Sequence, residues 1–123
     1  MICGLVSFAQ DKSDSPVVVV RQIFENYIKY QESPDSQENK TRMASALKSL
    51  QTTSDTSDFQ LLINVWMYYQ ATDFPTKDLI YPIFEKNRIA AVNAIKWRLQ
   101  NRKEWESDEG LKDLVYLKDK LSK

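Results

Sequence analysis

FQLLINVWMYY, residues Phe59 to Tyr69, is the stretch that decides the fold of this chain. Nine of its eleven residues are apolar or aromatic, and only Gln60 and Asn64 interrupt the run. A helix on a protein surface has one apolar stripe, whereas a helix that is apolar on all sides is buried. The run is too short to cross a bilayer, which takes about 20 apolar residues. We therefore predict a central buried helix over residues 58–72.

The residues around this run favour a helix over the competing interpretation, a buried β-strand. Ser57 lies three residues before Gln60, which is the spacing of a capping box at a helix start. Pro75 follows the run, and the residue before a proline is pushed out of the helical region. Helices avoid glycine and strand-rich folds use it in tight turns, so two glycines in 123 residues also favour an all-α fold.

Five further helices are predicted from start signals and from apolar spacing. Ser15-Pro16 and Ser33-Pro34 are typical starts, because serine caps a helix and proline fits its first position. The apolar spacing that follows them, and that recurs in the second half of the chain, is helical. The predicted helices span residues 16–31, 35–50, 76–85, 88–104 and 108–121. The sequence thus predicts an all-α, compact bundle of five or six helices around the central helix.

Residues 1–10, MICGLVSFAQ, differ in character from residues 11–123, which we predict to form a single helical domain. Ser7 and Ala9 place small residues at the −3 and −1 positions of a signal-peptidase site, after a mostly apolar run. The segment is interpreted either as the remnant of a signal peptide or as an N-terminal arm packed on the domain. Export to the periplasm and retention in the cytoplasm both remain open.

The composition excludes several kinds of chemistry. The chain has no histidine and Cys3 is its only cysteine, so it can form neither an internal disulfide nor a zinc site of Cys and His ligands. Catalytic triads that depend on histidine are excluded as well. Two isolated glycines cannot form a phosphate-binding loop. We therefore expect no cofactor and no metal, and an Asp/Glu pair of the kind that glycosidases use is the catalytic option that remains.

One stretch departs from an otherwise even distribution of charge. The net charge of the chain is zero, which argues against nucleic-acid binding. Yet residues 86–103 hold six basic residues and no acidic one, and four acidic residues follow within residues 104–109. The stretch is interpreted either as a basic surface for an acidic protein partner or as a solvated helix face whose charges the next segment offsets. In the first case Trp97 in this stretch and Trp105 just after it would be anchors, because Arg and Trp are enriched at binding hot spots. The predicted partner-binding residues are Lys86, Arg88, Lys96, Trp97, Arg98, Arg102, Lys103 and Trp105.

Residues 73–101, DFPTKDLIYPIFEKNRIAAVNAIKWRLQN, resemble one helical pair of a HEAT-type repeat. The resemblance lies in a short proline-bearing helix, a tight turn, and a longer helix with small residues and a basic side. Repeat arrays show further copies at a fixed period, and we find none in this chain. By its size and its N-terminal stretch alone, the chain also resembles small exported helical immunity proteins, which block a toxin by binding it.

The sequence therefore predicts a non-catalytic protein-binding module, and an exported or periplasmic immunity or inhibitor protein as its finer form. Two alternatives belong to other classes: a small hydrolase that uses Asp and Glu, and a structural protein that self-assembles, for example as a homodimer. A cleft with two neighbouring carboxylates would favour the hydrolase. An apolar patch on a two-fold axis would favour self-assembly.

Overall fold

The computed structural model describes residues 15–52 and 58–123. The segment for which a signal peptide or an arm is predicted, residues 1–10, lies outside the described residues. Within these ranges all regular structure is α-helical, which confirms the prediction of an all-α bundle. The helices are α2 (Pro16–Tyr30), α3 (Gln37–Thr52), α4 (Phe59–Tyr68), α5 (Thr76–Lys86), α6 (Arg88–Gln100) and α7 (Asp108–Leu121).

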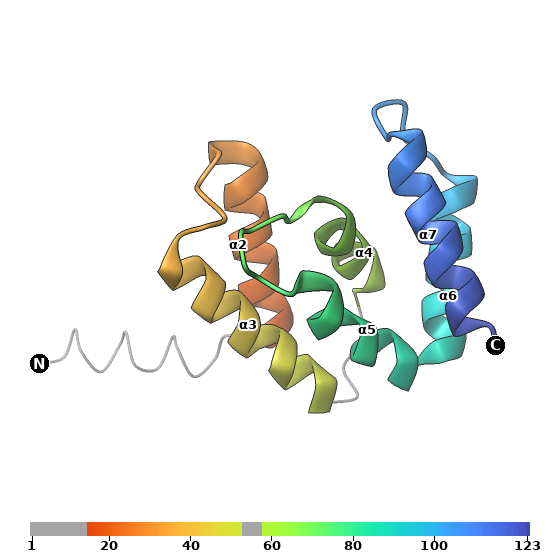
Figure 1. The fold of residues 1–123 in the computed structure, drawn as a ribbon, viewed down its shortest axis with the longest axis horizontal. Helices are drawn as coiled ribbons and strands as arrows, with labels where there is room; N and C mark the ends of the chain where they lie inside the picture. The colour runs from red at the N-terminus through yellow and green to blue at the C-terminus, as the bar shows by residue number, and fades with distance from the viewer. Residues whose placement is uncertain (1–14, 53–57) are drawn as a thin grey trace, which may run out of the picture.

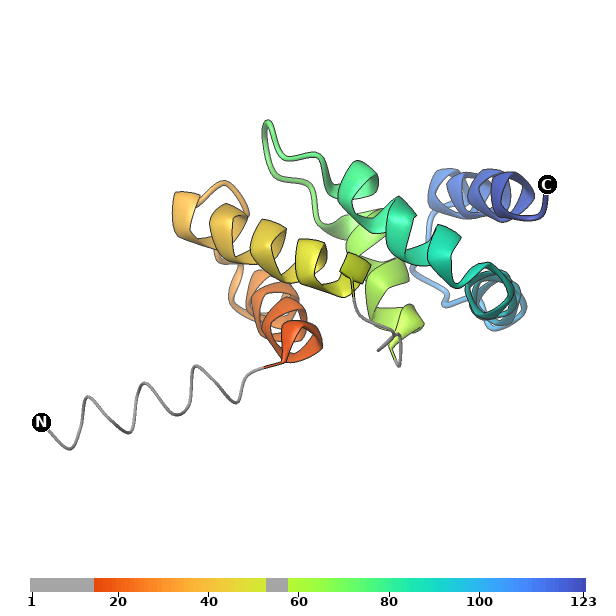
Figure 2. The same ribbon diagram turned by 90° about the horizontal axis from the view of Figure 1, so that it is seen from below.

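Helix α4 occupies the centre of the molecule. The pair α2 and α3 lies at one end, the pair α6 and α7 lies at the other, and α4 and α5 lie between them (Figure 1). The view from below shows the same order (Figure 2). Helix α2 packs on α3 and α3 on α5, whereas α4 contacts both α5 and α6, and α6 packs on α7. The central position of α4 explains why its sequence is apolar on almost every side.

The core is built around α4, as predicted. Seven of its residues are buried: Phe59, Leu61, Leu62, Ile63, Val65, Trp66 and Met67. Trp66 is 8% exposed, and its ring lies 6.2 Å from the ring of Phe84 of α5. Its indole Nε1 donates a hydrogen bond to Asp113 Oδ2 of α7 at 3.0 Å, so the polar atom of this large side chain is satisfied.

Helix α4 is shorter than predicted. It begins after Asp58, whose Oδ1 accepts a hydrogen bond from the backbone N–H of Leu61 at 3.0 Å; Ser57, the predicted cap, lies outside the described residues. It ends at Tyr68, because Tyr69 adopts an extended backbone (φ −86°, ψ 100°). Tyr69 is buried between the rings of Tyr27 and Phe74, and its hydroxyl donates to a backbone carbonyl of the α2–α3 loop. Tertiary packing of the Tyr69 side chain therefore ends the helix well before Pro75, the residue from which the helix end was predicted.

Other helix boundaries also differ from the prediction: α2 ends one residue earlier, α5 ends one residue later and α3 ends two residues later than predicted. Helix α3 begins two residues later than expected, because Ser36 rather than Ser33 accepts the capping hydrogen bond, from the N–H of Asn39 at 3.4 Å. Helix α6 ends at Gln100 rather than at residue 104. Arg102 and Lys103 therefore lie in the loop that leads to α7. The start of α2 is as predicted: Ser15 Oγ accepts from the N–H of Val18 at 3.3 Å, and Pro16 follows it.

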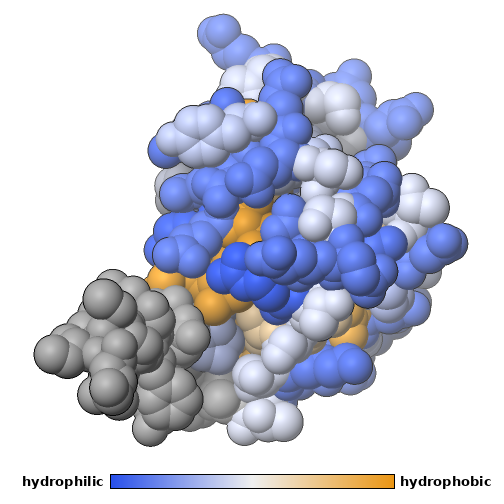
Figure 3. All heavy atoms as spheres, turned by 90° about the vertical axis from the view of Figure 1, so that its left-hand side faces the viewer, coloured by the Kyte–Doolittle hydropathy of each residue, from blue (hydrophilic) through white to orange (hydrophobic). Residues whose placement is uncertain are grey.

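Helix α3 covers one side of the core with a single apolar stripe. Its buried residues are Met43, Ala46, Leu47 and Leu50. Figure 3 shows the end of the molecule where α2 and α3 lie: hydrophilic side chains cover most of the coloured surface, and hydrophobic surface shows in patches between them. This end of the described molecule is therefore mostly polar.

Candidate functional site

A cleft of about 1010 Å³ opens over α4, between α2 and the segment that joins α6 to α7. We call it the aromatic cleft. Its floor is the one face of α4 that carries Gln60, Asn64 and Tyr68, which are spaced four residues apart. Its lining is Phe24, Tyr27, Ile28, Gln31, Glu32, Pro34, Gln60, Asn64, Tyr68, Trp97, Arg98, Lys103 and Trp105.

The two polar residues of the floor are the two that interrupt the apolar run of α4. Gln60 is held at both ends of its amide: Nε2 donates to the carbonyl of Ala94 at 2.9 Å, and Oε1 accepts from Arg98 Nη1 at 3.4 Å. Asn64 Oδ1, in contrast, is buried and has no hydrogen-bond partner among the described residues. A buried acceptor without a donor is unusual in a folded protein, and it singles out Asn64.

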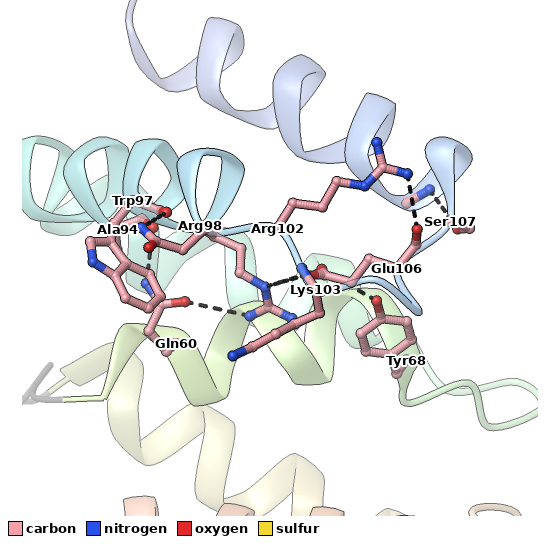
Figure 4. A network of polar contacts seen from close by, with 11 residues as sticks. Gln60, Tyr68, Ala94, Trp97, Arg98, Arg102, Lys103, Glu106 and Ser107 are labelled. Atoms are coloured by element: carbon pink, nitrogen blue, oxygen red, sulfur yellow. Dashed lines mark hydrogen bonds and ion pairs between the residues drawn. The ribbon is translucent and has the colours of Figure 1, made fainter.

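A buried ion pair holds the wall of the cleft on the α6 side. Arg98 and Glu106 are 5% and 3% exposed, and Arg98 Nε lies 3.1 Å from Glu106 Oε2 and 3.3 Å from Oε1. The backbone N–H of Lys103 also donates to Glu106 Oε1, at 2.8 Å. Figure 4 shows this network, in which Glu106 lies between the end of α6 and Tyr68 of α4. Because a buried charge is stable only when it is paired, the network fixes the loop between α6 and α7 against α4.

Tyr68 belongs to the same network. Its hydroxyl donates to Glu106 Oε2 at 3.5 Å. Burial raises the pKa of Tyr68 above its ordinary value, and the negative charge of Glu106 raises it further. The phenol serves as a hydrogen-bond donor to Glu106.

Large apolar side chains remain exposed along both walls. Trp97 is 51% exposed and Trp105 is 66% exposed on the α6 side, and the Trp105 ring lies 5.5 Å from the ring of Tyr68. On the opposite wall Ile28 of α2 is also exposed. Exposed apolar residues that gather around a depression are typical of binding sites, whereas single ones are ordinary.

Four of the eight predicted partner-binding residues come together in the cleft: Trp97, Arg98, Lys103 and Trp105. The remaining four, Lys86, Arg88, Lys96 and Arg102, are not part of the lining. The single basic helix face over residues 88–104 does not form, because α6 ends at Gln100. Nor is Arg98 a surface residue, since its charge faces Glu106.

The acidic segment after α6 offsets two charges of the basic stretch. Besides the Arg98 pair, Arg102 Nη2 donates to Asp108 Oδ1 at 2.7 Å. Both arginines also bridge the turn between α6 and α7, so these charges stabilise the loop that carries Trp105.

The sequence analysis missed the residues that α2 and α4 contribute to the cleft. A signal for the floor was present, because Gln60 and Asn64 are polar, four residues apart, and the only interruptions of a buried helix. Polar side chains at that spacing indicate a face of the helix that the core does not cover. No comparable signal marked Tyr27 and Ile28, which sequence spacing alone places on an ordinary apolar stripe.

The described residues also limit two other kinds of site. Residues 15–52 and 58–123 contain no group of three or more His, Cys, Asp or Glu side chains placed to hold a metal ion. None of the helices in that part of the chain combines the length and the apolar character that crossing a membrane requires.

Comparison of the chain with protein-family models, with curated proteins and with solved structures finds no significant match. The resemblance of residues 73–101 to a HEAT-type helical pair therefore stays a prediction. That stretch corresponds to α5, which contains Pro82, and to α6, which contacts it.

Proposed function

We propose that this protein is a non-catalytic protein-binding module that holds part of its partner in the aromatic cleft. The observation that carries the proposal is the position of two exposed tryptophans, Trp97 and Trp105, beside a preformed trough over α4. Binding sites are concave, largely apolar and furnished with a few fixed polar groups. Tryptophan is enriched among the residues that contribute most to protein–protein affinity.

The polar network supports this function because it fixes the site in advance. Gln60 and Arg98 are bonded to each other, and Arg98 is bonded to Glu106. A wall that is already ordered loses little conformational entropy when a partner binds, which favours affinity.

The finer proposal is an immunity or inhibitor protein that acts in the periplasm. It is supported by the apolar, signal-like character of residues 1–10. A fixed cleft suits an inhibitor, since blocking a toxin requires only that the partner be held.

The two alternative functions have less support. An Asp/Glu hydrolase needs two carboxylates facing one cleft, and among the described residues that line the aromatic cleft Glu32 is the one carboxylate. The nearby Glu106 is engaged by Arg98. Self-assembly would use exposed apolar residues such as Ile89 and Tyr116, which do not line the cleft.

The test is affinity capture from an extract of the source organism with three forms of the protein. The cleft variant is Trp97→Ala/Trp105→Ala, and the matched control is Ile89→Ala/Tyr116→Ala, which removes similarly exposed side chains outside the cleft. Circular dichroism establishes that all three are folded. We expect the wild type and the control to recover the same partner and the cleft variant to lose it. A partner recovered equally by all three would contradict the proposal.

A further inference from the structure

Building on the proposed binding function, we propose that the occupant of the aromatic cleft is an extended acidic segment of the partner protein. Its carboxylate would bind beside Arg98 and Lys103, and a backbone amide group of the segment would pair with Asn64. The segment would carry large apolar residues on both sides of its Asp or Glu. Three features of the cleft lead to this occupant.

The first feature is an unbalanced positive charge. Arg98 uses Nε to bind Glu106 and Nη1 to bind Gln60. Lys103 donates its backbone N–H to Glu106, but its ammonium group has no ion-pair partner in the described part of the chain. Figure 4 shows both side chains extending from the α6 side toward α4. Glu106 thus pairs with Arg98 alone, and a carboxylate from a ligand would give the Lys103 ammonium a partner on this wall.

The third charged residue of the lining, Glu32, limits where that carboxylate would bind. Glu32 follows the C-cap of α2, on the wall opposite Lys103. Like charges repel, so an acidic ligand side chain is favoured on the Lys103 side and disfavoured beside Glu32. The cleft therefore has a positive wall and a negative wall, and this difference in charge would orient a bound segment.

The second feature is the unsatisfied amide of Asn64. An asparagine side chain offers one acceptor and two donors. Asn64 Oδ1 is buried, so a ligand would pair with this oxygen only after the side chain turns about its terminal torsion, which has a broad energy minimum. A peptide group offers one N–H and one C=O, which complement such an amide. In an α-helix the backbone groups are already bonded within the helix, so a helical ligand could pair with Asn64 only through a side chain. The floor of the cleft therefore favours an extended backbone over a helix.

The third feature is the pair of apolar walls. Successive side chains of an extended chain point to opposite sides. A segment that lies along the trough would direct alternate side chains toward Tyr27 and Ile28 on one wall and toward Trp97 and Trp105 on the other. Because Lys103 is on the tryptophan side, the acidic residue would point there and its sequence neighbours would pack on α2. This arrangement explains why apolar residues should flank the acid on both sides.

The experiment selects ligands for the full chain from a displayed library of random linear 12-residue peptides. Enriched sequences are synthesised with capped ends, and their dissociation constants are measured by fluorescence polarisation. We expect an Asp or Glu flanked by aromatic or large aliphatic residues. Lys103→Gln should raise the dissociation constant about tenfold, as the loss of a hydrogen bond to a charged group does. Lys96→Gln is the matched control, since Lys96 is exposed on α6 outside the lining, and it should change little.

Two further variants test the detailed contacts. Replacing the ligand acid with its amide should weaken binding to the wild type but should have no additional effect on Lys103→Gln, because the two changes remove the same interaction. Asn64→Leu should raise the dissociation constant about fivefold. If Asn64→Leu fails to fold, the combination of Lys103→Gln with the amide form of the ligand still tests whether an acidic residue binds at Lys103.

Each contrary result identifies a different occupant. Selected peptides with helical apolar spacing and no acid would show a helix in the groove. A synthetic peptide of residues 1–10 that outcompetes every selected sequence would assign the cleft to the chain's own N-terminal segment. Absence of any peptide ligand, while captured partner still depends on Trp97 and Trp105, would mean a folded partner surface. These three results overturn the extended acidic segment and leave the binding function intact. Peptide binding and capture that both ignore the tryptophans would overturn the binding function itself.

Discussion

Replacing Glu106 with glutamine should destabilise the protein more than any other isosteric change at its charged residues. The substitution keeps the volume and one carbonyl acceptor of the side chain but removes its charge. Arg98, which is 5% exposed, then remains in the interior without a carboxylate partner. The hydrogen bonds from the backbone of Lys103 and from the Tyr68 hydroxyl, at 2.8 Å and 3.5 Å, lose their charged acceptor as well.

The expected loss in the free energy of unfolding is about 3 kcal/mol. Removing one partner of a buried ion pair typically costs about 3–5 kcal/mol. We expect the lower end, because the glutamine carbonyl can still accept one hydrogen bond from Arg98 Nε. A domain of this size has a total stability of about 5–15 kcal/mol, so the loss is a large fraction of it. It corresponds to a fall in Tm of about 10 °C.

Urea unfolding followed by circular dichroism measures this loss. The matched control is Asp108→Asn, which removes the carboxylate bonded to Arg102 in a pair whose side chains are 48% and 80% exposed. Because exposed pairs contribute about 0.2–1 kcal/mol, the control should be nearly as stable as the wild type. Combining Glu106→Gln with Arg98→Met should recover part of the loss, since no buried charge then lacks a partner. A loss below about 1 kcal/mol for Glu106→Gln would refute the idea that this pair fixes the loop.

Three further predictions concern the frame of the cleft. Trp66→Ala should lower the free energy of unfolding by about 3–5 kcal/mol, and a change within about 0.5 kcal/mol in thermal melts would contradict its place in the core. Burial, aided by the charge of Asp35, raises the pKa of Tyr69 from 10.0 to about 12. The folded state therefore keeps a proton that the unfolded state loses, so stability should fall as pH rises from 10 to 12; ultraviolet titration of wild type and Tyr69→Phe checks the assignment. Ser107→Ala should cost about 1 kcal/mol in urea unfolding, because Ser107 Oγ caps α7 by accepting from the N–H of Gly110 at 3.1 Å.

The existence of the helices could be predicted because their signals are local. The Ser15 cap lies directly before the helix that it starts, and the apolar run lies within α4 itself. The end of α4 could not be predicted in the same way. Tyr69 leaves the helix because its ring packs between Tyr27 and Phe74, which come from other segments of the chain. Such packing ends the helix before Pro75, the residue from which the helix end was predicted. Contacts between distant segments of this kind cannot be predicted from local sequence patterns.

The candidate site was predictable only in part, for a similar reason. From its charge alone, Arg98 is predicted to lie on a basic surface. In the structure the loop after α6 folds back so that Glu106 pairs with Arg98, and both side chains are buried. The cleft itself depends on how α2 and the α6–α7 loop are placed on either side of α4. The sequence could have indicated one element of it, the polar spacing of Gln60 and Asn64.

The measurement that tests the central claim most directly is the nuclear magnetic resonance spectrum of the indole N–H groups. The chain has three tryptophans, and two of them, Trp97 and Trp105, line the cleft. The third, Trp66, is buried and donates its indole N–H to Asp113, so it is an internal reference. On addition of the captured partner, we predict that the Trp97 and Trp105 signals shift and that the Trp66 signal stays in place. Saturated binding that leaves both cleft signals unmoved would show that the partner binds elsewhere.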